Sequence, residues 1–342
     1  MTSEIVLPAL ECPFGDKISP CADQVDRHVL EWARDFALLT DQAEIDRFRQ
    51  AKVGRLAART SPGSEAEALN LLADWQMWLF VFDDRYCDES ETGIHPEQLS
   101  RVITSFVRVL DNTDPPNTEG TAGVPVTANA TNAVNDPVCR VDPFTCALAD
   151  LKDRLAAMAS DQQTFRFLSA VRGYFLAQFW EAAHRADDRP AGLAEYEVMR
   201  RHSGAVPTCM ALIDVAGGFE LTAEEFCCHD VRALTDIAVN VTCWANDILS
   251  YPKEAARSLK VHSLPAVLAH ELQLSRADAI KVAATMHDAE VIHYLNVEKL
   301  LRRHAGPELL MYTEGLRDWM GGNLRWSLET GRYGSAAPSR PA

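Results

Sequence analysis

The chain has 342 residues, of which 47% are hydrophobic and 24% charged, and its formal net charge is −16. This balance is typical of a globular protein, whereas the acidic charge disfavours a nucleic-acid partner, because neutralising backbone phosphates needs clustered Lys and Arg. No apolar run approaches the roughly 18 residues that a membrane helix needs. The first residues lack the basic flank and apolar stretch of a secretory signal. We therefore expect a cytoplasmic protein without stable membrane insertion.

Nine cysteines are scattered along the chain without CxxC spacing. This pattern indicates neither a zinc site nor a disulfide framework. We expect reduced thiols that serve as small core residues.

Hydrophobic residues recur with a helical period along almost the whole chain. In residues 23–39, for example, Val25, Val29 and Phe36 fall near one face of a helix. Almost no segment alternates with period two, which predicts an all-α fold of about ten or more helices in a single domain, residues 1–342. Helices are predicted near residues 23–39, 42–58, 65–88, 97–110, 145–159, 162–186, 194–215, 232–257, 264–269, 276–302 and 307–331.

Three segments do not follow the helical period. Residues 1–22 form a Pro-containing N-terminal segment, and residues 334–342 have the composition of a frayed tail. Residues 111–143 are rich in turn formers and poor in large apolar side chains. A loop of that length is either functional or disordered, and we favour a flexible surface insertion over a substrate lid.

An acidic cluster stands at the end of a strongly apolar helix. Asp83 and Asp84 follow the apolar run directly, and Asp88 comes five residues after Asp83. The helix dipole disfavours negative charge at a C-terminal end, and neighbouring carboxylates repel one another unless a cation lies between them. Alone, the cluster is more simply explained by a solvated helix end.

A second polar set lies in a helix that is otherwise apolar. Asn246, Ser250 and Glu254 are spaced four residues apart, so they share one helical face. Buried polar side chains need partners, and oxygen donors suit Mg²⁺, which takes a few protein ligands together with substrate phosphates. The two sets together predict a metal site for a phosphate-bearing substrate. Pro252 is expected to kink the helix or end it just before Glu254.

Cationic residues add candidates for binding the substrate phosphate. Arg200, Lys253 and Arg332 would each alone be a surface charge, and Tyr333 follows Arg332 directly. Arg donates bidentate hydrogen bonds to phosphate oxygens, and a Tyr hydroxyl adds a further donor. Together these residues are suited to a diphosphate clamp.

Four motifs, in the same order along the chain, resemble those of the bacterial class I terpene synthases (terpene cyclases), and the resemblance extends over nearly the whole length. Two of them are the family's Asp-rich motif and its Asn-Asp-x-x-Ser-x-x-x-Glu motif. The others are the diphosphate sensor, linker and effector residues and the terminal Arg-Tyr pair. The matching residues are Asp83, Asp84 and Asp88; Asn246, Asp247, Ser250 and Glu254, with Lys253 at the expected basic position; Arg200, Ser203 and Gly204; and Arg332 and Tyr333, preceded by Trp326.

This chain departs from the family pattern in Pro252, in the 111–143 insertion and in the three residues, instead of two, that precede Asp88. The last difference leaves open whether Asp88 binds metal directly.

The resemblance implies a class I helical barrel, or bundle, with both metal motifs at its open mouth and three Mg²⁺ ions. The ions and basic residues would bind a prenyl diphosphate and draw off the diphosphate, leaving an allylic carbocation. The pocket would then need a dry wall of aromatic faces, and a glycine would let the backbone approach the reacting carbon. The implied metal ligands are Asp83, Asp84, Asp88, Asn246, Ser250 and Glu254; the implied substrate contacts are Arg200, Lys253, Arg332 and Tyr333; and we expect Phe82, Phe179 and Trp326 in the wall and Gly204 at the reacting carbon.

We therefore predict a Mg²⁺-dependent terpene cyclase that releases diphosphate. Farnesyl diphosphate is favoured as substrate on family frequency, and geranylgeranyl diphosphate stays open. A chain-elongating prenyl diphosphate synthase is the alternative, although it would carry a second Asp-rich motif where this chain has Asn246, Ser250 and Glu254. A non-catalytic helical interaction protein is the second alternative, and a homodimer is left open.

Overall fold

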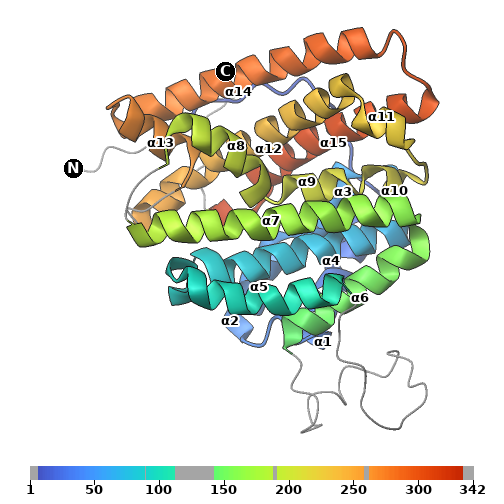
Figure 1. The fold of residues 1–342 in the computed structure, drawn as a ribbon, viewed down its shortest axis with the longest axis horizontal. Coiled ribbons are helices and arrows are strands. Elements are labelled where there is room, and N and C mark those ends of the chain that lie inside the picture. The colour runs from blue at the N-terminus through green and yellow to red at the C-terminus, as the bar shows by residue number, and fades with distance from the viewer. Residues whose placement is uncertain (1–6, 89, 112–141, 188–190, 258–261, 334–342) are drawn as a thin grey trace, which may run out of the picture.

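The structure is a computed structural model that describes residues 7–88, 90–111, 142–187, 191–257 and 262–333. The predicted 111–143 insertion and 334–342 tail therefore lie almost entirely outside the described residues. The described part contains helices and no strand, which confirms the all-α prediction (Figure 1). Its helices include none long and apolar enough to cross a membrane.

The helices agree with the about ten or more that the sequence predicts, although several predicted segments are divided into shorter helices. In chain order they are α1 (Ala22–Asp35), α2 (Gln42–Ala51), α3 (Val53–Thr60), α4 (Ala66–Phe82), the π-helix η1 (Asp83–Asp88), the 3₁₀-helix η2 (Glu91–Ile94), α5 (Pro96–Leu110), α6 (Pro143–Met158), α7 (Asp161–Asp187), α8 (Leu193–Ser203), α9 (Val206–Met210), α10 (Ile213–Gly217), α11 (Ala223–Cys227), α12 (His229–Arg257), α13 (Leu264–Glu271), α14 (Arg276–Leu301), α15 (Pro307–Glu329) and the 3₁₀-helix η4 (Gly331–Tyr333).

Single residues with left-handed backbone divide two of the predicted helices. Lys52, at φ 54°, separates α2 from α3, and Ala205, at φ 58°, separates α8 from α9. Hydrophobic periodicity continues across such a break because only one residue changes conformation. The predicted segments 42–58 and 194–215 are therefore each more than one helix.

Local sequence signals account for several helix starts. Pro96, Pro143 and Pro307 stand in the first turns of α5, α6 and α15, where the missing N–H of proline has no helical partner to lose. Thr222 and Glu225 form a reciprocal capping box at the start of α11.

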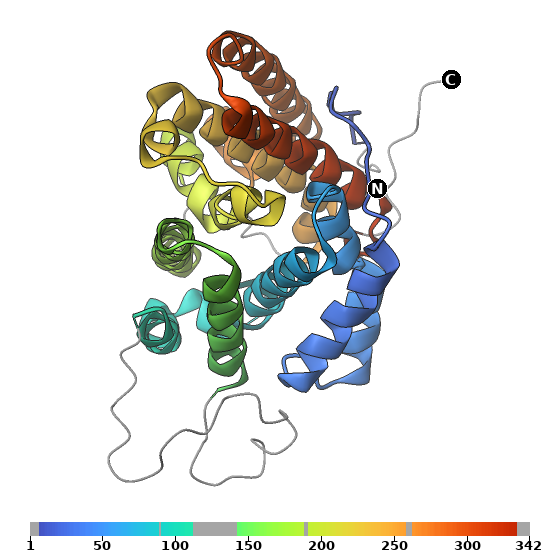
Figure 2. The same cartoon turned by 90° about the vertical axis from the view of Figure 1, so that its right-hand side faces the viewer.

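The helix α4 runs through the middle of the molecule and is buried on nearly all sides. In Figure 2, α14 and α15 lie above it, and α5, α6 and α7 lie to its other side. The short helix α3 packs against both α4 and α15, and an added Cβ at Gly322 of α15 would come within 2.6 Å of the Arg59 backbone of α3. This close contact fixes α15 beside the cavity described next.

The buried hydrophobic side chains of the described residues form one cluster that extends from Leu7 to Met320. Its densest part is aromatic: Trp78 stacks on Phe82 at 5.1 Å between ring centroids, and Phe106 meets both rings edge to face. The prediction of a single domain stays a prediction.

Candidate active site

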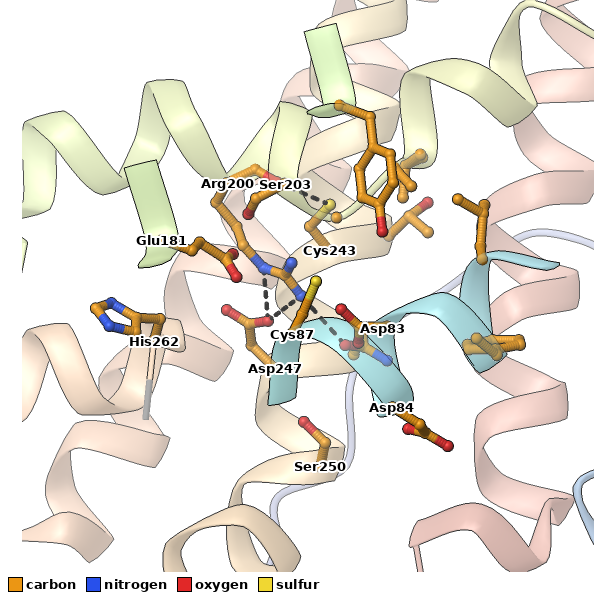
Figure 3. A pocket seen from close by; sticks show the side chains of 18 of the residues that line it. Asp83, Asp84, Cys87, Glu181, Arg200, Ser203, Cys243, Asp247, Ser250 and His262 are labelled. Carbon is orange, nitrogen blue, oxygen red and sulfur yellow. Dashed lines mark hydrogen bonds and ion pairs between the residues drawn. The ribbon is translucent and has the colours of Figure 1, made fainter. Parts of the chain in front are cut away.

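A cavity of about 350 Å³ lies among α3, α4, α7, α8, α9, α12 and α15. It brings together most of the side chains that the sequence singled out, although they come from five separate parts of the chain. Figure 3 shows the acidic segment of Asp83 and Asp84 facing the part of α12 that carries Asp247 and Ser250. The predicted site residues that line the cavity are Asp83, Asp84, Arg200, Gly204, Asn246, Ser250, Lys253, Glu254, Trp326 and Arg332.

The α12 side of the cavity is one continuous helical face. Asn246, Ser250 and Glu254 all line the cavity, as their spacing predicts. Of the two outcomes expected for Pro252, an end of the helix is wrong, because α12 continues through it to Arg257, and a kink stays a prediction. A proline inside a helix removes one hydrogen bond, and the buried packing of α12 tolerates that loss. Glu254 therefore stays on the helix that carries the other two residues.

Asp247, which follows Asn246 and also lines the cavity, anchors Arg200. It is 2% exposed, and its Oδ1 accepts hydrogen bonds from Arg200 Nε at 2.9 Å and Nη2 at 2.7 Å (Figure 3). Its Oδ2 accepts from the Tyr196 hydroxyl and from the Leu264 backbone N–H, the latter at 2.7 Å. Asp247 thus ties α12 to α8 and α13 and aims Arg200 at the cavity.

The charges of this network set the ionisation of its members. Burial alone would lower the pKa of Arg200, but the Asp247 carboxylate together with Cys243, Tyr196 and Glu181 keeps that pKa well above its ordinary value. Burial and the same carboxylate raise the pKa of Tyr196 well above its ordinary range. Arg200 is therefore a permanent cation, and Tyr196 a permanent hydrogen-bond donor.

The α4 side holds its carboxylates differently. Asp84 accepts a two-pronged contact from Arg332, with Oδ1 2.9 Å from Nη2 and Oδ2 3.3 Å from Nη1. Arg47 Nη2 also lies 3.2 Å from Asp84 Oδ2. The Arg332 guanidinium rests over the Phe80 ring, 4.6 Å from its centroid. These contacts fasten the acidic segment to α2 and to the C-terminal end of the described chain.

The acidic segment itself is a π-helix, Asp83–Asp88. A π-turn closes by a bond to the fifth residue on, so it takes up one more residue than an α-turn. The extra residue in the Asp-rich motif is accommodated in this wider turn. The side chains of Asp88 and Tyr333 lie outside the described residues, and their roles stay predictions.

The aromatic wall differs from the one expected. Phe82 is 0% exposed and belongs to the aromatic core between α4, α5 and α6, and Phe179 does not line the cavity either. Only Trp326 of the three expected residues lies on the wall, where it stacks on Phe80 at 5.6 Å. A helix that is apolar on all sides gives no sequence signal for which face meets a cavity. The aromatic residues that line the cavity are Phe80, Tyr174, Trp319 and Trp326.

Gly204 sits at the helix break between α8 and α9. An added Cβ there would lie 2.7 Å from Cys243 Sγ and 3.1 Å from Arg200 Nη1. Its lack of a side chain therefore leaves room for the thiol and the guanidinium beside the cavity.

Several polar residues of the cavity carried no sequence motif. Glu181 accepts a hydrogen bond from Arg185 Nη2 at 2.7 Å. Burial alone would raise the pKa of Glu181, but Arg185 and Arg200, together with His262 and Ser203, hold the pKa below its ordinary value. Burial lowers the pKa of His262 to about 4, so its imidazole is neutral at ordinary pH. Glu181 is one of several charged residues in α7, and His262 lies outside a helix, so the sequence offers no signal that singles out either residue.

The described cysteines differ in exposure: three are buried, three are intermediate and two are exposed. Burial raises the pKa of Cys209 and Cys243, which line the cavity, to about 12. Cys227 and Cys228 are exposed, so the expectation of core thiols is wrong for these two. They fall at the end of the short helix α11, where the chain runs along the surface.

The donors in the cavity fit a hard divalent cation that also binds substrate phosphate. Ser250 is 3% exposed, and its Oγ has no hydrogen-bond partner among the described residues, as expected of a buried ligand oxygen. In the described part of the chain, no three His, Cys, Asp or Glu side chains lie close enough to hold a metal by themselves. The oxygen donors are instead divided between two walls, which suits Mg²⁺, because it completes its shell with water and phosphate.

Comparison with known proteins decides the family. The family model of terpene synthase family 2, C-terminal metal binding, matches residues 74–292, which include both oxygen-bearing motifs. The chain belongs to this family. It is 35% identical to a 4-epi-cubebol synthase ((2E,6E)-farnesyl diphosphate cyclizing) of Streptosporangium roseum, over 96% of this chain and 93% of that protein. It is 36% identical to a (+)-T-muurolol synthase of Roseiflexus castenholzii, over 94% and 92%.

The solved structures agree on the fold. The germacradien-4-ol synthase from Streptomyces citricolor superposes with a TM-score of 0.76 at 22% identity, covering 94% of this chain and 98% of that one. The predicted terpene synthase resemblance and the predicted enzyme class are thus confirmed, and the family is a metal-binding one. The elongating synthase and the non-catalytic interaction protein are not favoured.

Proposed function

We propose that this terpene synthase ionises farnesyl diphosphate with three Mg²⁺ ions and cyclises the resulting carbocation to a sesquiterpene. The observation that carries this proposal is the composition of one cavity. Oxygen donors on α12 and η1 face each other near Arg200 and Arg332, and aromatic rings line the space beside them. The farnesyl chain is chosen because the relatives from Streptosporangium roseum and Roseiflexus castenholzii are named as farnesyl diphosphate cyclising.

The residues proposed to hold the ions are Asp83, Asp84 and Asp88 on one side and Asn246, Ser250 and Glu254 on the other. The bound ions would supply Lewis-acid stabilisation of the departing diphosphate. The orphaned Ser250 Oγ supports this assignment, since a buried hydroxyl without a partner costs free energy unless a ligand uses it.

Arg200, Lys253, Arg332 and Tyr333 are proposed to bind the diphosphate oxygens. Asp247 holds Arg200 by Nε and Nη2, and Nη2 also donates to Asn246 Oδ1 at 3.3 Å, so the guanidinium is already positioned beside the proposed metal ligand. Arg332 begins on Asp84, so binding of diphosphate has to draw some of its hydrogen bonds away from that carboxylate.

The aromatic rings of Phe80, Tyr174, Trp319 and Trp326 are proposed to face the carbocation. Their π faces stabilise positive charge and their bulk excludes bulk water. The Trp326 indole N–H donates to the Ala51 backbone oxygen at 2.9 Å, which holds its ring in place. Gly204 is proposed to lie near the reacting carbon, on the strength of the family resemblance and of its place on the wall.

The test is incubation of the purified enzyme with one prenyl diphosphate at a time, of ten, fifteen or twenty carbons, with and without Mg²⁺, followed by gas chromatography. Cyclic products from the fifteen-carbon substrate alone, released together with diphosphate, are expected. A requirement for isopentenyl diphosphate would instead identify an elongating synthase, and absence of Mg²⁺-dependent diphosphate binding by calorimetry would contradict the proposal altogether. The cytoplasmic location, the homodimer and the lack of a nucleic-acid partner stay predictions.

A further inference from the structure

Two contacts join the C-terminal ends of α4 and α15 beside the cavity. At the mouth, Arg332 after α15 meets Asp84 after α4. One turn deeper, Trp326 stacks on Phe80. Both helices therefore have their C-terminal ends at the mouth.

One further turn down, each helix presents an amide to the cavity. Gln76 precedes Phe80 by four residues and Asn323 precedes Trp326 by three, and both line the cavity. Residues at these spacings share a helical face, so the two amides belong to the layer below the stacked rings. Gln76 lies seven residues before Asp83, which places it about 10 Å along the helix axis from the acidic segment.

These amides lack partners although they are buried. Gln76 is 3% exposed, and neither its Oε1 nor its Nε2 has a hydrogen-bond partner among the described residues. Asn323 is 7% exposed, and its Nδ2 has none either. Buried polar atoms are nearly always paired, and a buried water commonly makes about three hydrogen bonds to such groups. The layer thus offers a donor from each helix and an acceptor from Gln76 to one small polar molecule.

We propose that Gln76 and Asn323 hold one water molecule that adds to the cyclised carbocation, so that the enzyme releases a terpene alcohol. This inference rests on the proposed function. The water oxygen gives a lone pair to the cationic carbon, a C–O bond forms, and the oxonium proton passes to the released diphosphate. The balance is one prenyl diphosphate and one water to one alcohol and one protonated diphosphate.

The position of the amides explains why a bound water would not capture the first cation, although the rest of the wall excludes water. The allylic cation forms at the mouth, where the charged residues bind diphosphate, and the amides line the same cavity one helical turn further from the mouth than Phe80 and Trp326. The water therefore meets the part of the chain that reaches the deeper layer, after ring closure has moved the charge there. Amides suit this task because they orient water without gaining or losing a proton. The 4-epi-cubebol and T-muurolol synthases are themselves named for alcohols.

The deciding experiment is turnover of farnesyl diphosphate by the unmodified enzyme in ¹⁸O-labelled water, with products identified by gas chromatography and mass spectrometry. A terpene alcohol that carries ¹⁸O is expected as the main product. Hydrocarbons alone, or an alcohol without the label, would overturn the water site and leave the cyclase function intact. No product at all would instead refute the proposed function.

Two variants locate the water. Gln76→Met and Asn323→Leu keep the side-chain size and remove hydrogen-bonding atoms, so each should lower the ratio of alcohol to hydrocarbon about tenfold, as expected for one lost partner. Thr242→Val is the matched control: Thr242 also lines the cavity, but its hydroxyl already donates to the Ala238 oxygen at 2.8 Å, so the ratio should not change. An unchanged ratio in both amide variants would overturn the assignment, and the labelling result stands even if a variant does not fold.

Discussion

The two sides of the cavity hold their charged groups in different ways. On the α12 side, Asp247 is buried and accepts hydrogen bonds from Arg200, Tyr196 and the Leu264 backbone, so α8, α12 and α13 are locked together. On the α4 side, Asp84 is paired with Arg332 and with the half-exposed Arg47. One side owes its order to a network that joins three helices, and the other to ion pairs, of which Asp84–Arg332 is also mostly buried.

The two sides therefore differ in how their arginines become available to the diphosphate. The α12 side has no charge that must change partner for Arg200 to bind diphosphate, whereas Arg332 on the α4 side has to share its donors between Asp84 and the substrate. Loss of Asp247 leaves Arg200, Tyr196 and the Leu264 N–H without their partner, whereas Asp84 keeps Arg47 when Arg332 turns to the substrate. We therefore expect changes on the α12 side to affect stability and changes at the rim to affect substrate capture.

The largest effect is expected when a proposed metal ligand is removed on either side. Asn246→Ala and Asp83→Ala should each lower turnover by about 10³-fold or more, because the Lewis-acid contribution is several kcal/mol. Neither side chain fills the core, so unfolding free energies should stay within about 1 kcal/mol of the unmodified enzyme. Steady-state assays and thermal unfolding measure the two quantities. Normal activity in either variant would remove that residue from the metal site.

The next largest effect is a loss of stability, and it compares the buried Asp247 network with the surface pair of Asp236 and Arg201. Asp247→Asn should lower the free energy of unfolding by about 3–5 kcal/mol, since it leaves the Arg200 charge buried without its counterion. The matched control is Asp236→Asn, whose partner Arg201 at 3.1 Å is partly exposed, and whose loss should cost at most about 1 kcal/mol. Denaturant titration of both variants gives the comparison. Equal losses would show that Asp247 is not the anchor of the α12 side.

A smaller effect is expected at the rim. Arg332→Ala should raise KM about tenfold, or ~1.4 kcal/mol, and barely change stability, because Arg47 still pairs with Asp84. Arg201→Ala is the control, since Arg201 bonds to Asn240 and Asp236 and does not line the cavity. Kinetics of the two variants with farnesyl diphosphate test this. If Arg332→Ala unfolds the enzyme instead, the rim pair is structural and the contrast between the two sides fails.

The same contrast explains what the sequence could predict. The α12 face was predictable because Asn246, Ser250 and Glu254 lie in one helix and their spacing alone sets their direction. The partners of Asp247 come from α8 and α13, and no spacing within α12 points to them. On α4, Phe80 and Phe82 have the same local pattern, yet only Phe80 meets the cavity. Which face of an all-apolar helix meets a cavity depends on the helices packed around it. The same holds for Gln76, whose position on the cavity wall could not be predicted from α4 alone.

The smallest effect is expected from alkylation of the cysteines. Their reactivity measures how well the α12 side of the cavity is shielded from solvent. Burial raises the pKa of Cys209 and Cys243 from the ordinary 9.0 to about 12, so both stay protonated and unreactive at pH 8. Iodoacetamide should therefore modify the exposed Cys227 and Cys228 and leave turnover unchanged, as peptide mass mapping and an activity assay would show. The folded state binds these two protons more tightly than the unfolded state does, so stability should fall as pH rises from about 9 towards 12. Rapid alkylation of Cys243 at pH 8 would mean that the wall beside Arg200 opens readily, which contradicts a preorganised α12 side.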